Sequence, residues 1–305
     1  MIVSGKFWAV PACFLSIARA VAIAMLVSLF LGTGAMAQAG NWQILTYPDP
    51  APGVSKTFCF GVNGAGAMVG YYQAPAQRAY LFADGLYTSL HPAGATKSSA
   101  WGINARGDVV GDYWVDTQEH GFLLRNGQLV TIDLPGKTMA HPRDINARGD
   151  IAGYYMTTSD LQGFILARDG AFTEVRYPNA VNTYVYGISD EGGVAGEYVD
   201  SQGGWHGFFR SKAGDFTSLD YPNASSTSAW KVNAGGEVAG YYYDSETPSI
   251  SHGFVWRNGV FQKSDYPGAT QTMIHGLNGQ GETCGMMSFS APTTSPQWGG
   301  FADAW

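Results

Sequence analysis

Six positions of the chain carry side chains that could recognise a polar, ring-shaped ligand. Each lies just before a Gly-Ile-Asn-like core, and they recur every 41 to 45 residues. They are Phe60, Trp101, Arg143, Tyr186, Trp230 and His275, with His141, Tyr184 and Lys231 as close neighbours. Aromatic faces stack on sugar rings, while Arg, Lys and His bind anionic groups, and ligand sites combine such walls with a few polar groups.

These residues can act together only if the fold brings them to one place. The ligand-binding candidates are Trp101, His141, Arg143, Tyr186, Trp230, Lys231 and His275. The alternative is that the aromatic side chains pack between structural units as core, while the charged ones are solvated.

Other eye-catching residues are better explained by structure than by catalysis. His120, His206 and His252 occupy the same place in different repeats, so they cannot converge on one metal ion. The glycines of 64–70 recur wherever a turn recurs, which does not favour a nucleotide loop. The sequence contains no G-x-S-x-G, H-E-x-x-H or C-x-x-C motif. We therefore assign no catalytic residue and predict no metal and no cofactor.

Three loop acids form a weaker pattern. Asp116, Asp200 and Asp244 each follow a predicted second strand. They could bind calcium, but the dense acidic spacing of dedicated calcium loops is missing. Turn capping, or pairing with the nearby histidine, is the favoured interpretation.

The elements that would position the candidates come from an internal repeat. The segment Trp101–Tyr113 has counterparts starting at the other five positions, and each is followed by a His-Gly-Phe-like segment and then, in most units, by a Tyr-Pro or Leu-Pro ending. Asn-Gly and Asp-Gly pairs mark tight hairpin turns between them. Each unit therefore predicts four short strands, and four strands in about 40 residues are typical of a β-propeller blade.

The two ends of the repeat region predict a closed ring. The last unit stops after a third strand at residues 300–305, whereas residues 40–48 match a fourth strand and align without gaps to residues 214–222. We therefore predict an all-β, six-bladed β-propeller with four antiparallel strands per blade, whose last blade is completed by the N-terminal strand. Closure of this kind hides sheet edges.

Residues 1–37 have the features of a signal peptide. Lys6 and Arg19 accompany an apolar run over 20–31, and Ala35-Met-Ala37 forms an A-x-A cleavage site. The run is too short to span a bilayer, which needs about 20 residues. We expect an exported, extracellular or periplasmic protein with a single propeller domain over 38–305 and no membrane association after cleavage. We expect it to be a monomer.

Charge narrows the range of partners. Removal of the leader leaves 15 basic and 24 acidic residues, a net charge of −9. Nucleic acid needs a basic surface, so we exclude it as a partner.

The Gly-Ile-Asn core followed by a His-Gly-Phe strand resembles the bacterial "probable extracellular repeat, HAF family" over essentially all of residues 40–305. The resemblance implies an exported bacterial repeat protein and no established activity.

Two cysteines remain after the leader is removed. Cys59 lies in the first strand of the first unit and Cys284 in the second strand of the sixth, which ring closure makes neighbours. A disulfide across this seam is possible if the Cα atoms lie within about 7 Å.

Three functions fit these observations. The leading prediction is a non-catalytic binding module for carbohydrate or another cell-surface polymer. The second is a propeller enzyme, a polysaccharide lyase or hydrolase, with His141, Arg143, Tyr186, Lys231 and His275 at one channel mouth. The third is a protein-interaction scaffold that uses the variable loops 243–251 and 288–298.

Overall fold

The computed structural model describes residues 43–45, 56–74, 76–134, 137–289 and 298–303. These residues form 24 β-strands and no helix, so none of them makes a helix able to cross a membrane. The predicted leader, residues 1–37, lies outside the described residues.

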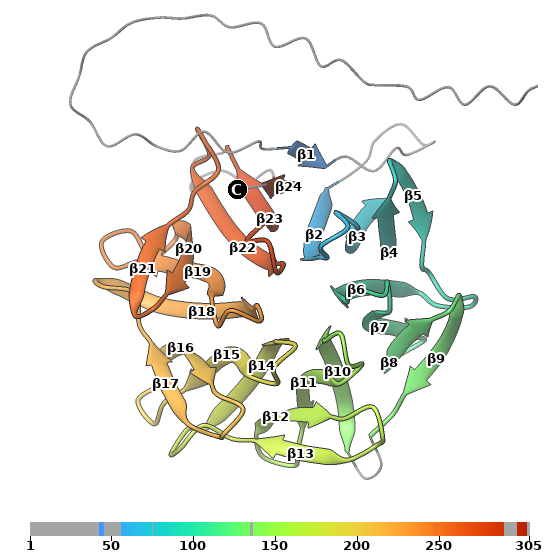
Figure 1. The fold of residues 1–305 in the computed structure, drawn as a ribbon, viewed down its shortest axis with the longest axis horizontal. Helices are drawn as coiled ribbons and strands as arrows, with labels where there is room; N and C mark the ends of the chain where they lie inside the picture. The colour runs from blue at the N-terminus through green and yellow to red at the C-terminus, as the bar shows by residue number, and fades with distance from the viewer. Residues whose placement is uncertain (1–42, 46–55, 75, 135–136, 290–297, 304–305) are drawn as a thin grey trace, which may run out of the picture. The chain divides into compact units, whose positions relative to one another are not determined.

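Five sheets are each built from four consecutive, antiparallel strands (Figure 1). The first contains β2 (Thr57–Val62), β3 (Met68–Ala74), β4 (Ala76–Ala83) and β5 (Leu86–Ser89). The second contains β6 (Lys97–Ile103), β7 (Val109–Val115), β8 (Gln118–Arg125) and β9 (Gln128–Ile132). The third contains β10 (Thr138–Ile145), β11 (Ile151–Met156), β12 (Leu161–Leu166) and β13 (Phe172–Val175). The fourth contains β14 (Asn182–Ile188), β15 (Val194–Val199), β16 (Trp205–Arg210) and β17 (Phe216–Leu219). The fifth contains β18 (Ala224–Val232), β19 (Val238–Asp244), β20 (Ser251–Arg257) and β21 (Val260–Lys263).

The remaining four strands come from the two ends of the chain. They are β22 (Gln271–Leu277), β23 (Thr283–Ser288), β24 (Trp298–Asp303) and β1 (Gln43–Leu45), in the order β1-β24-β23-β22. Ile44 lies opposite Phe301 in the antiparallel pair β1–β24. The all-β propeller arrangement is thus confirmed, but the described strands form five blades of consecutive strands rather than the predicted six. Five blades are complete within continuous segments, and the sixth sheet gains its fourth strand only from β1.

The first strand of every sheet contains a β-bulge at the same repeat position. The register shifts fall between Cys59 and Gly61 in β2, between Ala100 and Gly102 in β6, and at the matching places in β10, β14, β18 and β22. A bulge leaves one residue unpaired and redirects its side chain. The six bulged residues are those that precede the Gly-Ile-Asn core.

The bulge explains the glycine that closes the core in each unit. A Cβ at Gly70 would lie 1.8 Å from the Phe58 carbonyl oxygen, and one at Gly240 would lie 2.0 Å from the Ser228 oxygen. No side chain fits at these separations, so the backbone itself requires glycine there.

Asparagines in the turns after the inner strands connect neighbouring sheets. In its own turn, Asn63 Oδ1 accepts hydrogen bonds from the backbone of Ala65 and Ala67, both at 3.0 Å. Its Nδ2 donates to the Asn104 carbonyl of the next sheet at 3.0 Å. Equivalent bonds run from Asn104 to Asn146, Asn146 to Ser189, Asn233 to Asn278, and Asn278 back to Asn63. The last bond joins the sixth sheet to the first.

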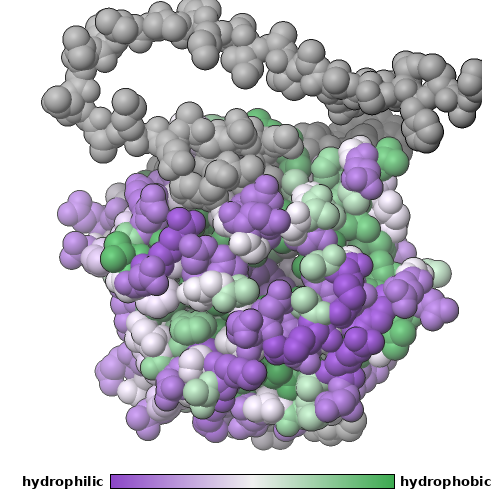
Figure 2. Space-filling view, viewed as in Figure 1, coloured by the Kyte–Doolittle hydropathy of each residue, from purple (hydrophilic) through white to green (hydrophobic). Residues whose placement is uncertain are grey.

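The His-Gly-Phe segment supplies core and a surface pair. Its aromatic residue is fully buried in every sheet, as Tyr80, Phe122, Phe164, Phe208, Phe254 and Phe301. The histidines face an aspartate that follows the fourth strand, as between His206 Nδ1 and Asp220 Oδ1 at 2.7 Å. In the same way, His120 pairs with Asp133 in the second sheet, and His252 pairs with Asp265 in the fifth. Seen from the direction of Figure 1, hydrophilic residues cover most of the described surface (Figure 2).

The loop acids serve turns, as favoured from the sequence. Asp200 accepts hydrogen bonds from the backbone of Gln202 and Gly204, both at 2.8 Å, and pairs with His206 at 3.2 Å. Asp244 accepts from the backbone of Glu246 and Thr247.

Candidate functional site

The six bulged residues converge in the centre of the ring. The ring centroids of Phe60 and Trp101 are 4.4 Å apart, and those of Phe60 and His275 are 5.0 Å apart. Trp230 lies 4.2 Å from His275 and 4.4 Å from Tyr186. The fold therefore brings these side chains to one place, which was the condition for their acting together.

They fill the channel instead of lining an open mouth. Phe60, Arg143, Tyr186 and His275 are all less than 10% exposed, and His275 is only 2% exposed. Burial, followed by the charge of Lys231, lowers the pKa of His275 to about 3, so its imidazole is neutral at neutral pH. The alternative that these aromatic side chains are core describes them better than a ligand-binding rim does.

Arg143 has its own acidic partner inside the channel. Its Nη1 lies 3.3 Å from Asp112 Oδ2, and its Nη2 donates to the Tyr154 hydroxyl at 2.7 Å. The guanidinium also lies 4.0 Å from the centroid of the Trp101 ring, a cation–π contact. Trp101 Nε1 donates to the same Asp112 oxygen at 2.5 Å. Arg143 is therefore committed to internal contacts and is not free to bind an anionic ligand.

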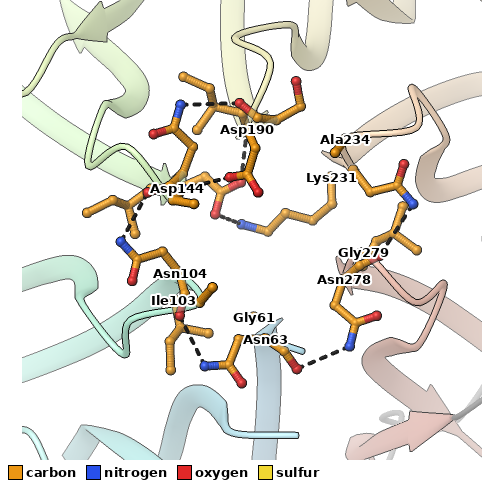
Figure 3. Close-up of a pocket in the computed structure, with 18 of the residues that line it drawn as sticks. Gly61, Asn63, Ile103, Asn104, Asp144, Asp190, Lys231, Ala234, Asn278 and Gly279 are labelled. Atoms are coloured by element: carbon orange, nitrogen blue, oxygen red, sulfur yellow. Dashed lines mark hydrogen bonds and ion pairs between the residues drawn. The ribbon is translucent and has the colours of Figure 1, made fainter. Parts of the chain in front are cut away.

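Lys231 is likewise paired, at the channel end that carries the asparagine turns (Figure 3). Its Nζ lies 2.8 Å from Asp144 Oδ1, and the two side chains are 5% and 10% exposed. Gly61, Gly102, Gly187 and Gly276 occupy the same repeat position in the other four inner strands. At this position, a Cβ on Gly187 would lie 2.8 Å from the Lys231 Cα. Among the residues that the structure describes, the pair therefore supplies the side chains that cross the channel at this level.

A small cavity of about 110 Å³ lies above this pair and is ringed by the asparagine turns. Figure 3 shows Asn63, Asn104 and Asn278 around it, with their amide groups directed to the next turn. Because these amides are used between sheets, the cavity has room for water but presents few free polar groups.

A larger cleft opens between the fourth and fifth blades, toward the opposite end of the inner strands. Its volume is about 260 Å³, and its lining residues are Glu197, Trp205, Ser226, Thr227, Ser228, Tyr241 and Tyr243. Trp205 is 42% exposed and stacks on Tyr184 with ring centroids 5.6 Å apart. Aromatic walls and hydroxyl groups thus meet at a single accessible place.

A buried carboxyl group lies at the inner wall of this cleft. Glu197 Oε1 accepts a hydrogen bond from the Tyr186 hydroxyl at 2.6 Å. Burial raises the pKa of Glu197, although hydrogen bonds from Ser228 and Tyr186 oppose the shift. Glu197 also raises the pKa of Tyr241, after burial as the main cause. The cleft therefore holds a carboxyl group that stays protonated to a higher pH than an exposed glutamate.

Known structures with a similar fold share little sequence with this chain. The structure of a putative TolB from Agrobacterium tumefaciens has a TM-score of 0.57 and 11% identity, and covers 84% of this chain and 91% of that one. TolB from Acinetobacter baumannii has a TM-score of 0.53 and 10% identity, covering 69% of this chain and 55% of that one. A streptogramin B lyase structure gives 0.48 and 15% identity, over 83% of this chain and 81% of that one. The two TolB similarities support the propeller fold alone. Neither a family model nor a curated protein matches the sequence.

The sequence interpretation missed the cleft because it considered only the first strand of each unit. Glu197 and Tyr241 directly follow the closing glycine of the second strand. That repeat position holds Tyr71, Asp112, Tyr154, Glu197, Tyr241 and Met286. Two acids among aromatic residues break the repeat there, a signal visible in the sequence once the register is known.

Cys59 and Cys284 lie in one core cluster, with Leu45, Val62 and Met68, between the first and sixth sheets. Both thiols are buried and free in this structure. Burial and the adjacent Cys59 raise the pKa of the Cys284 thiol, which disfavours the reactive thiolate. The seam thus brings the two cysteines together, and the disulfide stays a prediction.

Proposed function

We propose that this protein is an exported, non-catalytic carbohydrate-binding propeller whose binding site is the cleft between the fourth and fifth blades. The observation that carries the proposal is the exposed Trp205 beside Tyr243, Tyr241 and the Glu197 carboxyl group. In this proposal the leader 1–37 is removed, and residues 38–305 form one monomeric domain of HAF-type repeats in which β1 completes a sixth blade.

The lining chemistry suits a sugar. Indole and phenol rings can stack on the apolar face of a pyranose, and the hydroxyl of Ser226 can exchange hydrogen bonds with its hydroxyl groups. The volume of about 260 Å³ lies just below the range of roughly 300–1,000 Å³ usual for small-molecule sites. A single sugar unit or the end of a chain fits this size better than an internal segment of a polymer.

The charge of the site favours a neutral sugar. The described lining of the cleft contains no cation, and its one carboxyl group is that of Glu197, whose pKa is raised by burial. The chain without its leader is also acidic, with 15 basic and 24 acidic residues and a net charge of −9, and repels anionic polymers. The cations expected from the sequence to bind an anionic group, Arg143 and Lys231, already pair with Asp112 and Asp144.

Hydrolysis of a glycosidic bond is less well supported. A raised carboxyl pKa suits a general acid, as at Glu197. However, glycosidases use two carboxyl groups about 5–9.5 Å apart, and the described lining of the cleft contains only one. A lyase site built from Lys231 and His275 would need open access, but both are less than 5% exposed.

The scaffold hypothesis has less support still. Loop 243–251 can be described, and it is ordered by the Asp244 turn. Most of the second loop, 290–297, lies outside the described residues. Co-purification of one defined partner would favour this function over sugar binding.

The test is glycan binding by mature protein. We expect hits among neutral glycans on an array, followed by a measurable Kd in calorimetry. Trp205→Ala should weaken binding at least 10-fold because it removes the stacking face. Trp114→Ala is the matched control, since Trp114 contacts Lys97 in the second blade, away from the cleft.

Two results would overturn the proposal. One is the absence of binding across broad neutral and acidic panels. The other is an equal loss of affinity in Trp205→Ala and Trp114→Ala. Turnover of any bound glycan, abolished by Glu197→Gln, would instead support the enzyme.

A further inference from the structure

We propose that the junction of the second and third blades holds one divalent transition-metal ion, bound by Asp112, Glu119 and His141. These residues come from β7, β8 and β10, and each offers one ligand atom. The three atoms lie within 4.8 Å of one another. No short motif links them in sequence; the repeat register alone brings them together.

An orphaned carboxylate oxygen is the observation that points to a missing ligand. The Glu119 side chain is 5% exposed, and its Oε2 is buried without a hydrogen-bond partner. Its other oxygen, Oε1, lies 3.0 Å from His141 Nδ1. An unpaired, buried carboxylate oxygen costs free energy unless a proton donor or a cation satisfies it. A metal ion between Glu119 and its two neighbours would do so.

Asp112 is oriented for the same role. Trp101 Nε1 and Arg143 Nη1 both contact its Oδ2, at 2.5 and 3.3 Å. These two contacts hold the carboxylate in one orientation. Such outer contacts are typical of metal ligands, which need partners that hold their orientation.

The local charge also favours a cation. Two carboxylates meet one guanidinium here, and His141 must be neutral to act as a ligand. The buried site then carries one excess negative charge. A divalent ion reverses that imbalance, whereas the metal-free site leaves two carboxylates close together.

The donor set selects the class of metal. One imidazole nitrogen with two carboxylate oxygens suits Zn²⁺ or Mn²⁺ better than Ca²⁺, which prefers six to eight oxygen ligands. Tetrahedral Zn²⁺ with bonds of about 2.1 Å separates its ligand atoms by about 3.4 Å. The observed bound of 4.8 Å therefore requires side-chain rotation to change the separations by up to about 1.4 Å.

The other junctions lack this donor set, which makes them internal controls. At the junction of the fourth and fifth blades the same three repeat positions hold Glu197, Trp205 and Ser228. At the junction of the third and fourth they hold Tyr154, Leu161 and Tyr184. Among the residues that the structure describes, the junction of the second and third blades is where two carboxylates and a histidine come close enough to hold one metal ion.

The experiment is metal binding by untagged, full-length mature protein freed of metal by chelation. We expect one Zn²⁺ per chain by calorimetry and elemental analysis, and Co²⁺ should give visible absorption bands of a low-coordinate site. Glu119→Gln and His141→Gln should each weaken Zn²⁺ binding at least 10-fold. His206→Gln is the control, because His206 lies between two exposed aspartates on the surface.

Folding is checked separately. Without metal, Glu119→Gln should melt at or above the temperature of the parent protein, because it removes one of two close carboxylates. Added Zn²⁺ should then raise the melting temperature of the parent but not of the variant. Failure to bind Zn²⁺ or Mn²⁺ stoichiometrically, binding unchanged in both variants, or equal loss in His206→Gln would each overturn the proposal. Selective Ca²⁺ binding would overturn the assigned metal class.

Discussion

The buried pair Lys231–Asp144 makes a sharp prediction about stability. Its atoms are 2.8 Å apart, and both side chains are at most 10% exposed. Lys231 Nζ also contacts the carbonyl oxygens of Trp101 and Arg143, and the Asp144 carboxylate accepts a hydrogen bond from the Ile188 backbone at 2.9 Å. Each charge is thus satisfied only while its partner remains.

Removing one member should leave an uncompensated buried charge. Such losses cost about 3–5 kcal/mol, whereas replacing both members of a buried pair is often nearly neutral. We therefore expect Lys231→Met and Asp144→Asn each to lower the free energy of unfolding by about 3–5 kcal/mol. The double variant should lose no more than the worse single variant, because it removes both charges and keeps the Ile188 contact.

The assay is urea unfolding followed by tryptophan fluorescence, with the four proteins treated as a double-mutant cycle. Strong non-additivity is the signature of a coupled pair. Two single variants that each lose less than about 1 kcal/mol, or a double variant that loses their sum, would refute the reasoning, because either result means that water or another group solvates the charges.

Three further predictions concern the channel and the seam. In the folded state burial lowers the pKa of His275 to about 3, whereas in the unfolded chain this histidine protonates near 6.5. The free energy of unfolding should therefore fall as the pH drops below 6.5, by about 2 kcal/mol at pH 5. In His275→Phe the free energy of unfolding should depend less on pH between pH 4 and 7, and an unchanged dependence would contradict burial of the ring. Deletion of residues 40–48 removes β1 and should abolish cooperative unfolding in calorimetry, so an unaltered melting transition would show that the pairing with β24 is dispensable. Protein from an oxidising compartment should yield a linked Cys59–Cys284 peptide in non-reduced digests, and two alkylated thiols would end that prediction.

The repeat made the scaffold predictable because its signals are local and were repeated many times. Three signals each have a single geometric interpretation. They are the asparagine–glycine turns, the glycine that closes each core, and a fourth strand separated in sequence from the other three of its sheet. The split between residues 40–48 and the last three strands predicted the sheet order β1-β24-β23-β22 correctly. Even the convergence of Phe60 and His275 followed from the register.

The role of the side chains that converge in the channel did not follow from the register. The sequence places Arg143 and Lys231 near the ends of the first strands of two different units. It does not show that Asp112 lies 3.3 Å from Arg143, or that Asp144 lies 2.8 Å from Lys231. Whether a cation is free for a ligand depends on such distances between different blades. The same reason hid Glu119, which becomes notable only beside His141 from the next blade.

The sheet shared between the two chain ends has a consequence for the order of synthesis. Among the described strands β1 is made before the others, and its partner β24 is made after them. At about 5–20 residues per second, the roughly 250 residues between them take about 12–50 s to make. Throughout that time five blades can form while β1 has no partner. A protein that holds the unfinished chain in this interval would therefore act before the ring closes.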